Sequence, residues 1–169
     1  MVLFPGQVNG NFVTYSDCRG GCKALRYDIT ADTTTTLPGG SGNDYGSAIT
    51  PDGTTYILRD TDTDCSGAQI VRAPIAGPQV VIASIPTGRD IAFMFASVNA
   101  DSSVDLFFNE YRCTRAYPSD VYEIPGADTA PAVAAPAPTS ASVGLTQGTG
   151  RQLYPQGSVG TPSTDANFG

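Results

Sequence analysis

The order of apolar and polar residues along the chain predicts short β-strands rather than helices. Gly and Pro interrupt almost every window of roughly a dozen residues, and Thr and Val are abundant between them, which disfavours helix formation. Eight segments are rich in β-branched or aromatic residues and are bounded by Gly, Pro, Asn or Asp, as short strands are. They are NFVTYSD, KALRYDI, TTYILRD, AQIVRAPI, QVVIASIP, DIAFMFASV, VDLFFNEY and SDVYEIP. The pattern predicts an all-β fold.

The strand pattern recurs with a period of about 48 residues. When SAITPDG is aligned with ASVNADS, Asp52 lies over Asp101 at an offset of 49, and LPGG then lies over IPTG at an offset of 48. The cysteines agree, because Cys18, Cys65 and Cys113 are spaced by 47 and 48 residues. Markers that share one period indicate three copies of one structural unit.

Each unit is expected to hold four antiparallel strands, with a turn at Asn9-Gly10, Asp52-Gly53 or Asp101-Ser102 between the first two. Second strands are expected at 12–16, 55–59 and 104–108, third strands at 24–29, 69–75 and 120–124, and fourth strands at about 32–37 and 78–85. Four strands in a period of ~40 to 50 residues are typical of one propeller blade. We therefore expect three β-propeller-type blades within residues 1–126, at about 2–40, 41–90 and 91–126.

SAITPDGTTYILRD, followed by IVRAPI and IPTG, resembles the repeats of TolB-like propellers, in which a Pro-Asp-Gly turn joins the first two strands of each blade. The resemblance is best over residues 45–90, looser over 9–40 and weakest over 95–126, where Ala100-Asp101-Ser102 replaces Pro-Asp-Gly. It implies a six-bladed ring, found outside the cytoplasm or within larger proteins, that serves as a scaffold for protein contacts.

The number of units departs from this family. Three blades cannot close a ring, and an open array leaves strand edges and blade faces exposed. We therefore expect a partial or open propeller. Either the remaining blades lie in another part of a longer protein, or two or more chains complete the ring, or the three sheets pack as a non-propeller array.

The composition changes after residue 126. Residues 127–141 are rich in Pro and Ala and are expected to form an extended, poorly packed linker. Residues 142–169 are expected to be disordered, to form an arm that binds a neighbour, or to begin another unit, because SVGLTQGTGRQLYP can be aligned with GSAITPDGTTYILR.

Charge and hydropathy narrow the range of partners. The formal net charge of −7 opposes binding to phosphate backbones and anionic lipid. No run approaches the ~20 apolar residues that a membrane helix needs, and MVLFPGQVNG has no signal-peptide pattern. We therefore expect protein partners rather than nucleic acid or membrane insertion.

The four cysteines favour an oxidising compartment outside the cytoplasm, because they are even in number in a chain rich in Thr, Gly and Asp. Cys18 and Cys22 enclose RGG, a spacing that closes a small hairpin loop. Cys65 and Cys113 would have to meet across the fold. We therefore expect a Cys18–Cys22 disulfide and leave the other pairing open.

The chain contains no histidine. This removes the Ser/His/Asp and Cys/His forms of nucleophilic catalysis and the commonest transition-metal ligand. An enzyme would have to use carboxylates, Tyr, Lys or bound calcium. Carboxylate pairs such as Asp60 with Asp62, or Glu110 with Glu123, can serve as acid and base in glycoside cleavage, but nothing in the sequence places either pair across a pocket.

DTDTDCSG places Asp60, Asp62 and Asp64 at alternate positions, as a calcium loop does when it gathers oxygen ligands. An EF-hand loop would need Gly in place of Cys65 and Glu in place of Val71. The alternatives are a shallow calcium site and a hydrated polar loop; no other cofactor is indicated.

The residues Pro51, Asp52 and Gly53 are interpreted as conformational. Pro fixes φ, Asp can accept a hydrogen bond from the backbone ahead of it, and Gly accepts a positive φ. Repetition of the turn supports this interpretation, because a catalytic site is seldom copied once per blade.

The densest apolar stretches are FMF at 93–95 and LFF at 106–108. They are expected to pack one blade against the next, or to form an intermolecular surface. The loop NEYRCTRAYPSD carries residue types that are enriched at protein interfaces: Tyr111, Arg112, Arg115 and Tyr117.

Taken together, these features favour a non-enzymatic module outside the cytoplasm that acts by protein contact, through self-association or within a larger complex. The alternative is a calcium-dependent carbohydrate-binding protein or a propeller enzyme that uses carboxylates.

Overall fold

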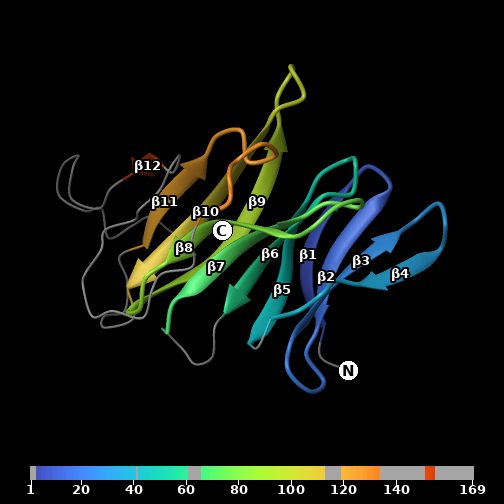
Figure 1. Cartoon of the computed structure of the whole chain (residues 1–169), viewed down its shortest axis with the longest axis horizontal. Coiled ribbons are helices and arrows are strands. Elements are labelled where there is room, and N and C mark those ends of the chain that lie inside the picture. The colour runs from blue at the N-terminus through green and yellow to red at the C-terminus, as the bar shows by residue number, and fades with distance from the viewer. Residues whose placement is uncertain (1–2, 41, 61–65, 113–118, 134–150, 155–169) are drawn as a thin grey trace, which may run out of the picture.

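The chain folds into three antiparallel β-sheets (Figure 1). The computed structural model describes residues 3–40, 42–60, 66–112, 119–133 and 151–154. Within these ranges the chain forms twelve strands and no helix, so this part of the protein also lacks any helix long and apolar enough to cross a membrane. The prediction of an all-β fold is confirmed, and none of the sheets closes on itself.

Each sheet has four strands in the order in which they occur along the chain. The first sheet holds β1 (Leu3–Asn9), β2 (Phe12–Asp17), β3 (Lys23–Asp28) and β4 (Thr33–Thr36). The second holds β5 (Asn43–Ile49), β6 (Thr55–Asp60), β7 (Ala68–Ala73) and β8 (Val80–Ile85). The third holds β9 (Arg89–Val98), β10 (Val104–Arg112), β11 (Ser119–Ile124) and β12 (Arg151–Tyr154). The first two sheets correspond to the units expected at about 2–40 and 41–90, and β9, β10 and β11 of the third sheet correspond to the unit expected at about 91–126.

The strand β12 comes from the C-terminal segment whose role the sequence left open. Its backbone pairs with β11, with Tyr154 opposite Val121 and Arg151 opposite Glu123. The third sheet therefore gains its fourth strand from a distant part of the chain, whereas the first two sheets are continuous in sequence.

The second sheet lies between the other two and is covered on both faces (Figure 1). All four residues of Thr55–Leu58 in β6 are buried, because a strand between two layers has no face in contact with water. One apolar cluster joins the first and second sheets and contains Ala24, Leu37, Ile57, Val71 and Ala73. A larger cluster joins the second and third sheets and includes Tyr56, Leu58, Ile70, Met94, Leu106, Phe108 and Ile124.

The first and second sheets approach closely at Gly46 in β5. A Cβ atom added there would lie 2.7 Å from the carbonyl oxygen of Tyr15 in β2 and would also overlap Thr14 Oγ1. Only glycine leaves room for two strands at this separation. At this short separation the backbone amide of Gly46 donates a hydrogen bond of 2.9 Å to Ser16 Oγ in the first sheet.

The first residues of the Pro/Ala-rich stretch pack against the sheets instead of forming loose chain. Ala127 and Ala130 are buried, and Ala127 N donates to Val104 O while Val133 N donates to Val81 O. The expectation of poorly packed chain does not hold for residues 127–133, because Ala side chains are small enough to fill the space beside β7 and β10.

Candidate functional site

The turn after β5 is held by its own carboxylate. Asp52 Oδ1 accepts hydrogen bonds from Thr50 Oγ1 (2.5 Å) and Thr54 N (3.0 Å), and Oδ2 accepts one from Thr54 Oγ1 (3.2 Å). Gly53 follows with φ +81°. Burial acts to raise the pKa of Asp52, but the hydrogen bonds from Thr50 and Thr54 outweigh it, so the pKa lies below its ordinary value of 3.8. These are the conformational roles that the sequence indicated.

The turn after β9 repeats this arrangement. Asp101 Oδ1 accepts hydrogen bonds from Ser103 N (3.0 Å) and Ser103 Oγ (2.6 Å), and Ser102 occupies the position of Gly53 with φ +70°. The hydrogen bond from the Ser103 side chain lowers the pKa of Asp101. The turn with Ala-Asp-Ser therefore keeps the backbone hydrogen bonds of the turn with Pro-Asp-Gly and the bond from the amide two residues after the Asp. It differs at the position of Thr50, where Asn99 donates to Ser103 and Asp105 instead.

The first strands of the three sheets lie beside one another and are joined by one side chain. β1 contacts β5, and β5 contacts β9. Gln7 in β1 accepts hydrogen bonds at Oε1 from Ile49 N (3.3 Å) and Ala96 N (3.2 Å), and its Nε2 donates to Ala96 O (3.2 Å). Sequence reasoning missed Gln7, since a single Gln in a strand carries no signal of contacts with two other sheets.

Each of these first strands contains a bulge. The register shifts between Pro5 and Val8 in β1 and between Gly46 and Ala48 in β5. In β9 it shifts between Ile91 and Met94, which pair with Glu110 and Phe108 of β10. Bulges bend a strand and are frequent beside binding sites. Here the three bulged segments face a common space.

That space is a cleft of about 480 Å³ lined by residues of all three sheets. Aromatic rings on its wall come from Phe4, Tyr45, Phe93 and Tyr111, and carboxylates come from Asp60 and Asp90. Asp90 accepts hydrogen bonds from Tyr111 OH (3.0 Å) and from Ile91 N (2.7 Å). Rings together with carboxylates can contact a sugar or a cationic side chain.

The structure brings together only part of the predicted sites. Of the three calcium candidates, Asp60 lines the cleft, while Asp62 and Asp64 lie outside the described residues. The described residues contain no group of three His, Cys, Asp or Glu side chains that could hold a metal ion.

Of the two carboxylate pairs considered from the sequence, Glu110 and Glu123 lie on opposite faces of the third sheet, and Asp62 of the other pair lies outside the described residues. Glu110 is buried in an ion pair with Arg89, whereas Glu123 lies opposite Phe107 on the other face of the third sheet. The two carboxylates that share the cleft, Asp60 and Asp90, come from different units, and the sequence did not pair them.

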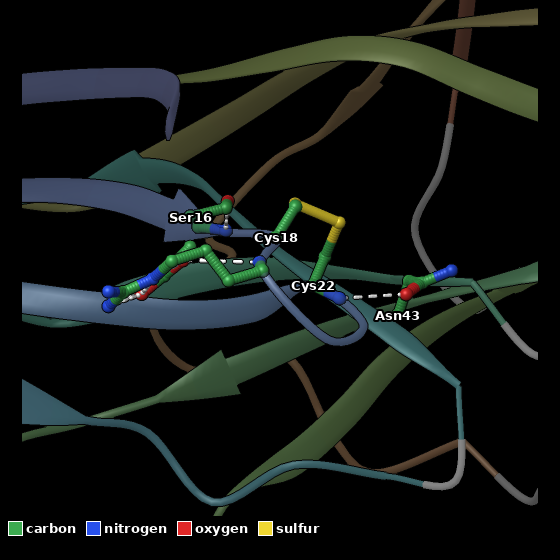
Figure 2. The surroundings of a disulfide bond; sticks show 7 residues. Ser16, Cys18, Cys22 and Asn43 are labelled. Atoms are coloured by element: carbon green, nitrogen blue, oxygen red, sulfur yellow. Dashed lines mark hydrogen bonds and ion pairs between the residues drawn. A yellow bond between two sulfur atoms is a disulfide. The ribbon is translucent and has the colours of Figure 1, made fainter. Parts of the chain in front are cut away.

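The Cys18–Cys22 disulfide forms as the spacing indicated (Figure 2). The loop that it closes is attached to the second sheet, because Cys22 N donates to Asn43 Oδ1 (2.8 Å) and Asp44 N donates to Cys22 O (2.9 Å). Cys65 and Cys113 lie outside the described residues, so their pairing stays open.

The predicted interface loop is described only at its start. Tyr111 is half-buried near the end of β10 and lies on the wall of the cleft. Arg112 is the last residue of β10. Arg115 and Tyr117 lie outside the described residues.

The stretches FMF and LFF serve two surfaces, because alternate residues of a strand face opposite sides. Met94, Leu106 and Phe108 lie in the core. Phe93 and Phe95 are 60% and 47% exposed, and Phe95 stacks on Phe107 with ring centroids 5.1 Å apart. We call the surface formed by Phe95, Phe107 and Glu123 the outer face of the third sheet.

The first sheet also has an apolar side that no other sheet covers. Val13 and Tyr15 in β2, and Leu25 and Tyr27 in β3, are half-buried. They alternate with the buried residues that face the second sheet. We call the surface formed by Val13, Tyr15, Leu25 and Tyr27 the outer face of the first sheet.

The fold and these surfaces define an all-β protein of three stacked four-stranded sheets, with a disulfide-closed loop and a cleft where the sheets meet. No protein-family model, curated protein or solved structure matches the chain.

Proposed function

We propose that this chain is a non-enzymatic β-propeller-type module that acts outside the cytoplasm by protein contact, through self-association or assembly into a larger complex. The observation that carries the proposal is the pair of outer faces. The stack of three sheets buries both faces of the second sheet. Among the described residues, no further layer covers Phe95 and Phe107 at one end of the stack or Tyr15, Leu25 and Tyr27 at the other. Exposed apolar surface of this kind marks interaction sites in soluble proteins.

Three further features support the propeller-type arrangement. The repeated Asp turns make the sheets copies of one unit. Their first strands lie side by side, as the innermost strands of blades do, and Gln7 connects them. The cleft lies where these strands diverge. The Cys18–Cys22 disulfide supports a location outside the cytoplasm.

Light scattering of the purified chain over a hundredfold range of concentration tests the proposal. A mass that is a multiple of 17.5 kDa, or a large assembly, is the expected result. A mass of 17.5 kDa at every concentration, with no change when the outer faces are substituted, contradicts self-association.

A second candidate function is calcium-dependent carbohydrate binding or carboxylate-based catalysis in the cleft. It is favoured by one observation, the presence of Asp60 and Asp90 among aromatic residues on the same cleft wall, because stacked rings and carboxylates are suited to sugars. Thermal denaturation with and without millimolar calcium tests the metal: an unchanged melting temperature would exclude the calcium-dependent form.

A further inference from the structure

The first sheet packs on the second with the same face that the second sheet presents to the third. Thr14 pairs with Arg26 across β2 and β3, and Tyr56 pairs with Arg72 across β6 and β7. Each arginine donates to a backbone carbonyl of the following unit: Arg26 Nη1 to Gly53 O (3.0 Å), and Arg72 Nη1 to Ala127 O (2.9 Å). Arg26 and Arg72 therefore occupy equivalent positions.

This equivalence identifies what each outer face corresponds to inside the molecule. Tyr15 and Leu25 are adjacent to Thr14 and Arg26, so they correspond to Ile57 and Val71. Ile57 and Val71 are the residues with which the second sheet packs on the first. The outer face of the first sheet therefore corresponds to the face of the second sheet that the first sheet covers.

The outer face of the third sheet is the matching half. Phe107 pairs with Phe95 and Glu123, as Leu58 pairs with Tyr45 and Ile70. Leu58 and Ile70 belong to the surface with which the second sheet packs on the third. The outer faces of the first and third sheets therefore correspond to the two surfaces that pack together where one sheet of the stack meets the next.

Each face carries residues of both charges at its edge. Lys23, the chain's only lysine, pairs with Asp17 across β2 and β3, and Glu123 pairs with Arg151 across β11 and β12. The match between the two faces therefore rests on their apolar residues, which occupy the positions that pack at the internal interfaces.

We propose that the outer face of the third sheet packs against the outer face of the first sheet of a second copy of this chain, and so repeats the internal interface between chains. The inference deepens the proposed assembly function and rests on it. The contact is heterologous, since two different faces meet, and it generates a ring if the rotation closes and a filament if it does not. Phe95 and Phe107 then contact the side chains of Tyr15, Leu25 and Tyr27.

A complementation experiment tests this contact. Phe95→Glu places a charge on one face, and Leu25→Glu places a charge on the other. Each variant alone should have an apparent dissociation constant at least roughly tenfold higher than the wild-type chain, as loss of a central aromatic or aliphatic contact gives. An equal mixture of the two still offers one intact face from each chain, so it should form a one-to-one complex of 2 × 17.5 = 35 kDa.

Ile75→Glu is the matched control, because Ile75 is 55% exposed and lies in the loop between β7 and β8, outside both faces. It should associate like the wild-type chain. Circular dichroism and thermal unfolding of all variants confirm that each retains the fold. Where either face variant is destabilised, Phe95→Ser and Leu25→Ser replace the Glu substitutions.

The outcomes separate this contact from the broader assembly function. If the wild-type chain associates and the face variants associate equally well, the contact is wrong while assembly stands. If only one of the two variants loses association while the other behaves like the wild-type chain, two like faces meet and the head-to-tail contact is wrong. If each variant is monomeric and their mixture also stays monomeric, the head-to-tail contact is wrong as well. If the wild-type chain is monomeric throughout, the head-to-tail contact and the self-associating form of the proposed function both fail, and only assembly with other proteins is left.

Discussion

Replacement of Gly46 by Ala probes how closely the first two sheets must approach. The φ angle of Gly46 is not in the left-handed region, so Ala fits the backbone and the effect comes from the contacts of the new methyl group. That group would lie 2.7 Å from the carbonyl oxygen of Tyr15 and against Thr14 Oγ1. Thr14 cannot rotate freely, since Oγ1 donates to Leu25 O at 3.1 Å, and the Tyr15 carbonyl moves only with β2.

The magnitude follows from three contributions. Forcing a methyl group into packed structure destabilises by about 1–3 kcal/mol, and weakening the hydrogen bond from Gly46 N to Ser16 Oγ costs about 1 kcal/mol. The lower entropy of the unfolded chain with Ala offsets about 0.4–1 kcal/mol. The net loss in the free energy of unfolding is about 1–3.5 kcal/mol, which corresponds to a fall in melting temperature of roughly 2–14 °C for a chain of this length.

Urea and thermal denaturation followed by circular dichroism measure this change. Gly20→Ala is the control, because a Cβ at Gly20 meets no atom within 4 Å and the expected change stays within about 0.5 kcal/mol. If Gly46→Ala is no less stable than Gly20→Ala, then the close approach of β2 and β5 is not a feature of the folded protein.

Three further changes test other contacts. Gln7→Met leaves the backbone groups of Ala96 and Ile49 without their partner and should lower the free energy of unfolding by about 2 kcal/mol. Gln79→Met removes an exposed hydrogen bond to Pro38 O and a partly buried one from Arg59 Nη2, and should lower it by less than about 1 kcal/mol, because Arg59 keeps its bonds to Asp44. The pKa of Asp52 lies below 3.8 in the folded protein, so its carboxylate stabilises the fold at neutral pH. This contribution is lost as the pH falls through the pKa of the folded state. Urea titrations should therefore show that Asp52→Asn is less stable than the wild-type chain at pH 7, and that the difference shrinks below pH 3.8. Replacing Cys18 and Cys22 together by Ser opens a loop with a sequence separation of 4, and calorimetry should show a loss of at most about 2 kcal/mol, since short loops constrain the unfolded chain least; an unchanged stability would mean that the loop is held by its contacts with Asn43 and Asp44 alone.

The strands and two of the turns could be predicted because their causes are local. A turn built by Asp52 depends on Thr50, Gly53 and Thr54, which are adjacent in sequence. The same local chemistry at Asp101 survives the loss of Pro and Gly. Because such turns recur at a regular spacing in the sequence, they predict the number of sheets without any knowledge of how the sheets stack.

The first turn was aligned with an error of one residue. The sequence placed Gly10 over Gly53, but Asn9 pairs directly with Phe12, whereas Ile49 pairs with Thr55 across a longer connection. The position equivalent to Tyr56 is therefore Thr14 rather than Val13. A slip of one residue reverses the face of every side chain in a strand, so the sequence alone could not assign the outer faces.

The cleft could not be predicted, because it depends on how separate units stack. Asp60 ends the second strand of the second sheet and Asp90 lies near the start of the first strand of the third sheet. The approach of β5 to β9 places both on one wall. Residues 127–133 were misjudged for a related reason. The composition of this stretch indicates that its Ala and Pro residues bury little surface each. It does not indicate that the sheets leave a space that Ala127 fills.

The hydrogen bonds of Gln7 also constrain the order in which the chain can become ordered. Its partners Ile49 and Ala96 lie 42 and 89 residues further along the chain. During synthesis the hairpins within each sheet can form as soon as their two strands are complete, because their contacts are local. The side-chain amide of Gln7 is synthesised before both partners and has to remain hydrated until β9 has left the ribosome. The strand β1 therefore reaches its final contacts only after the third sheet has begun to form.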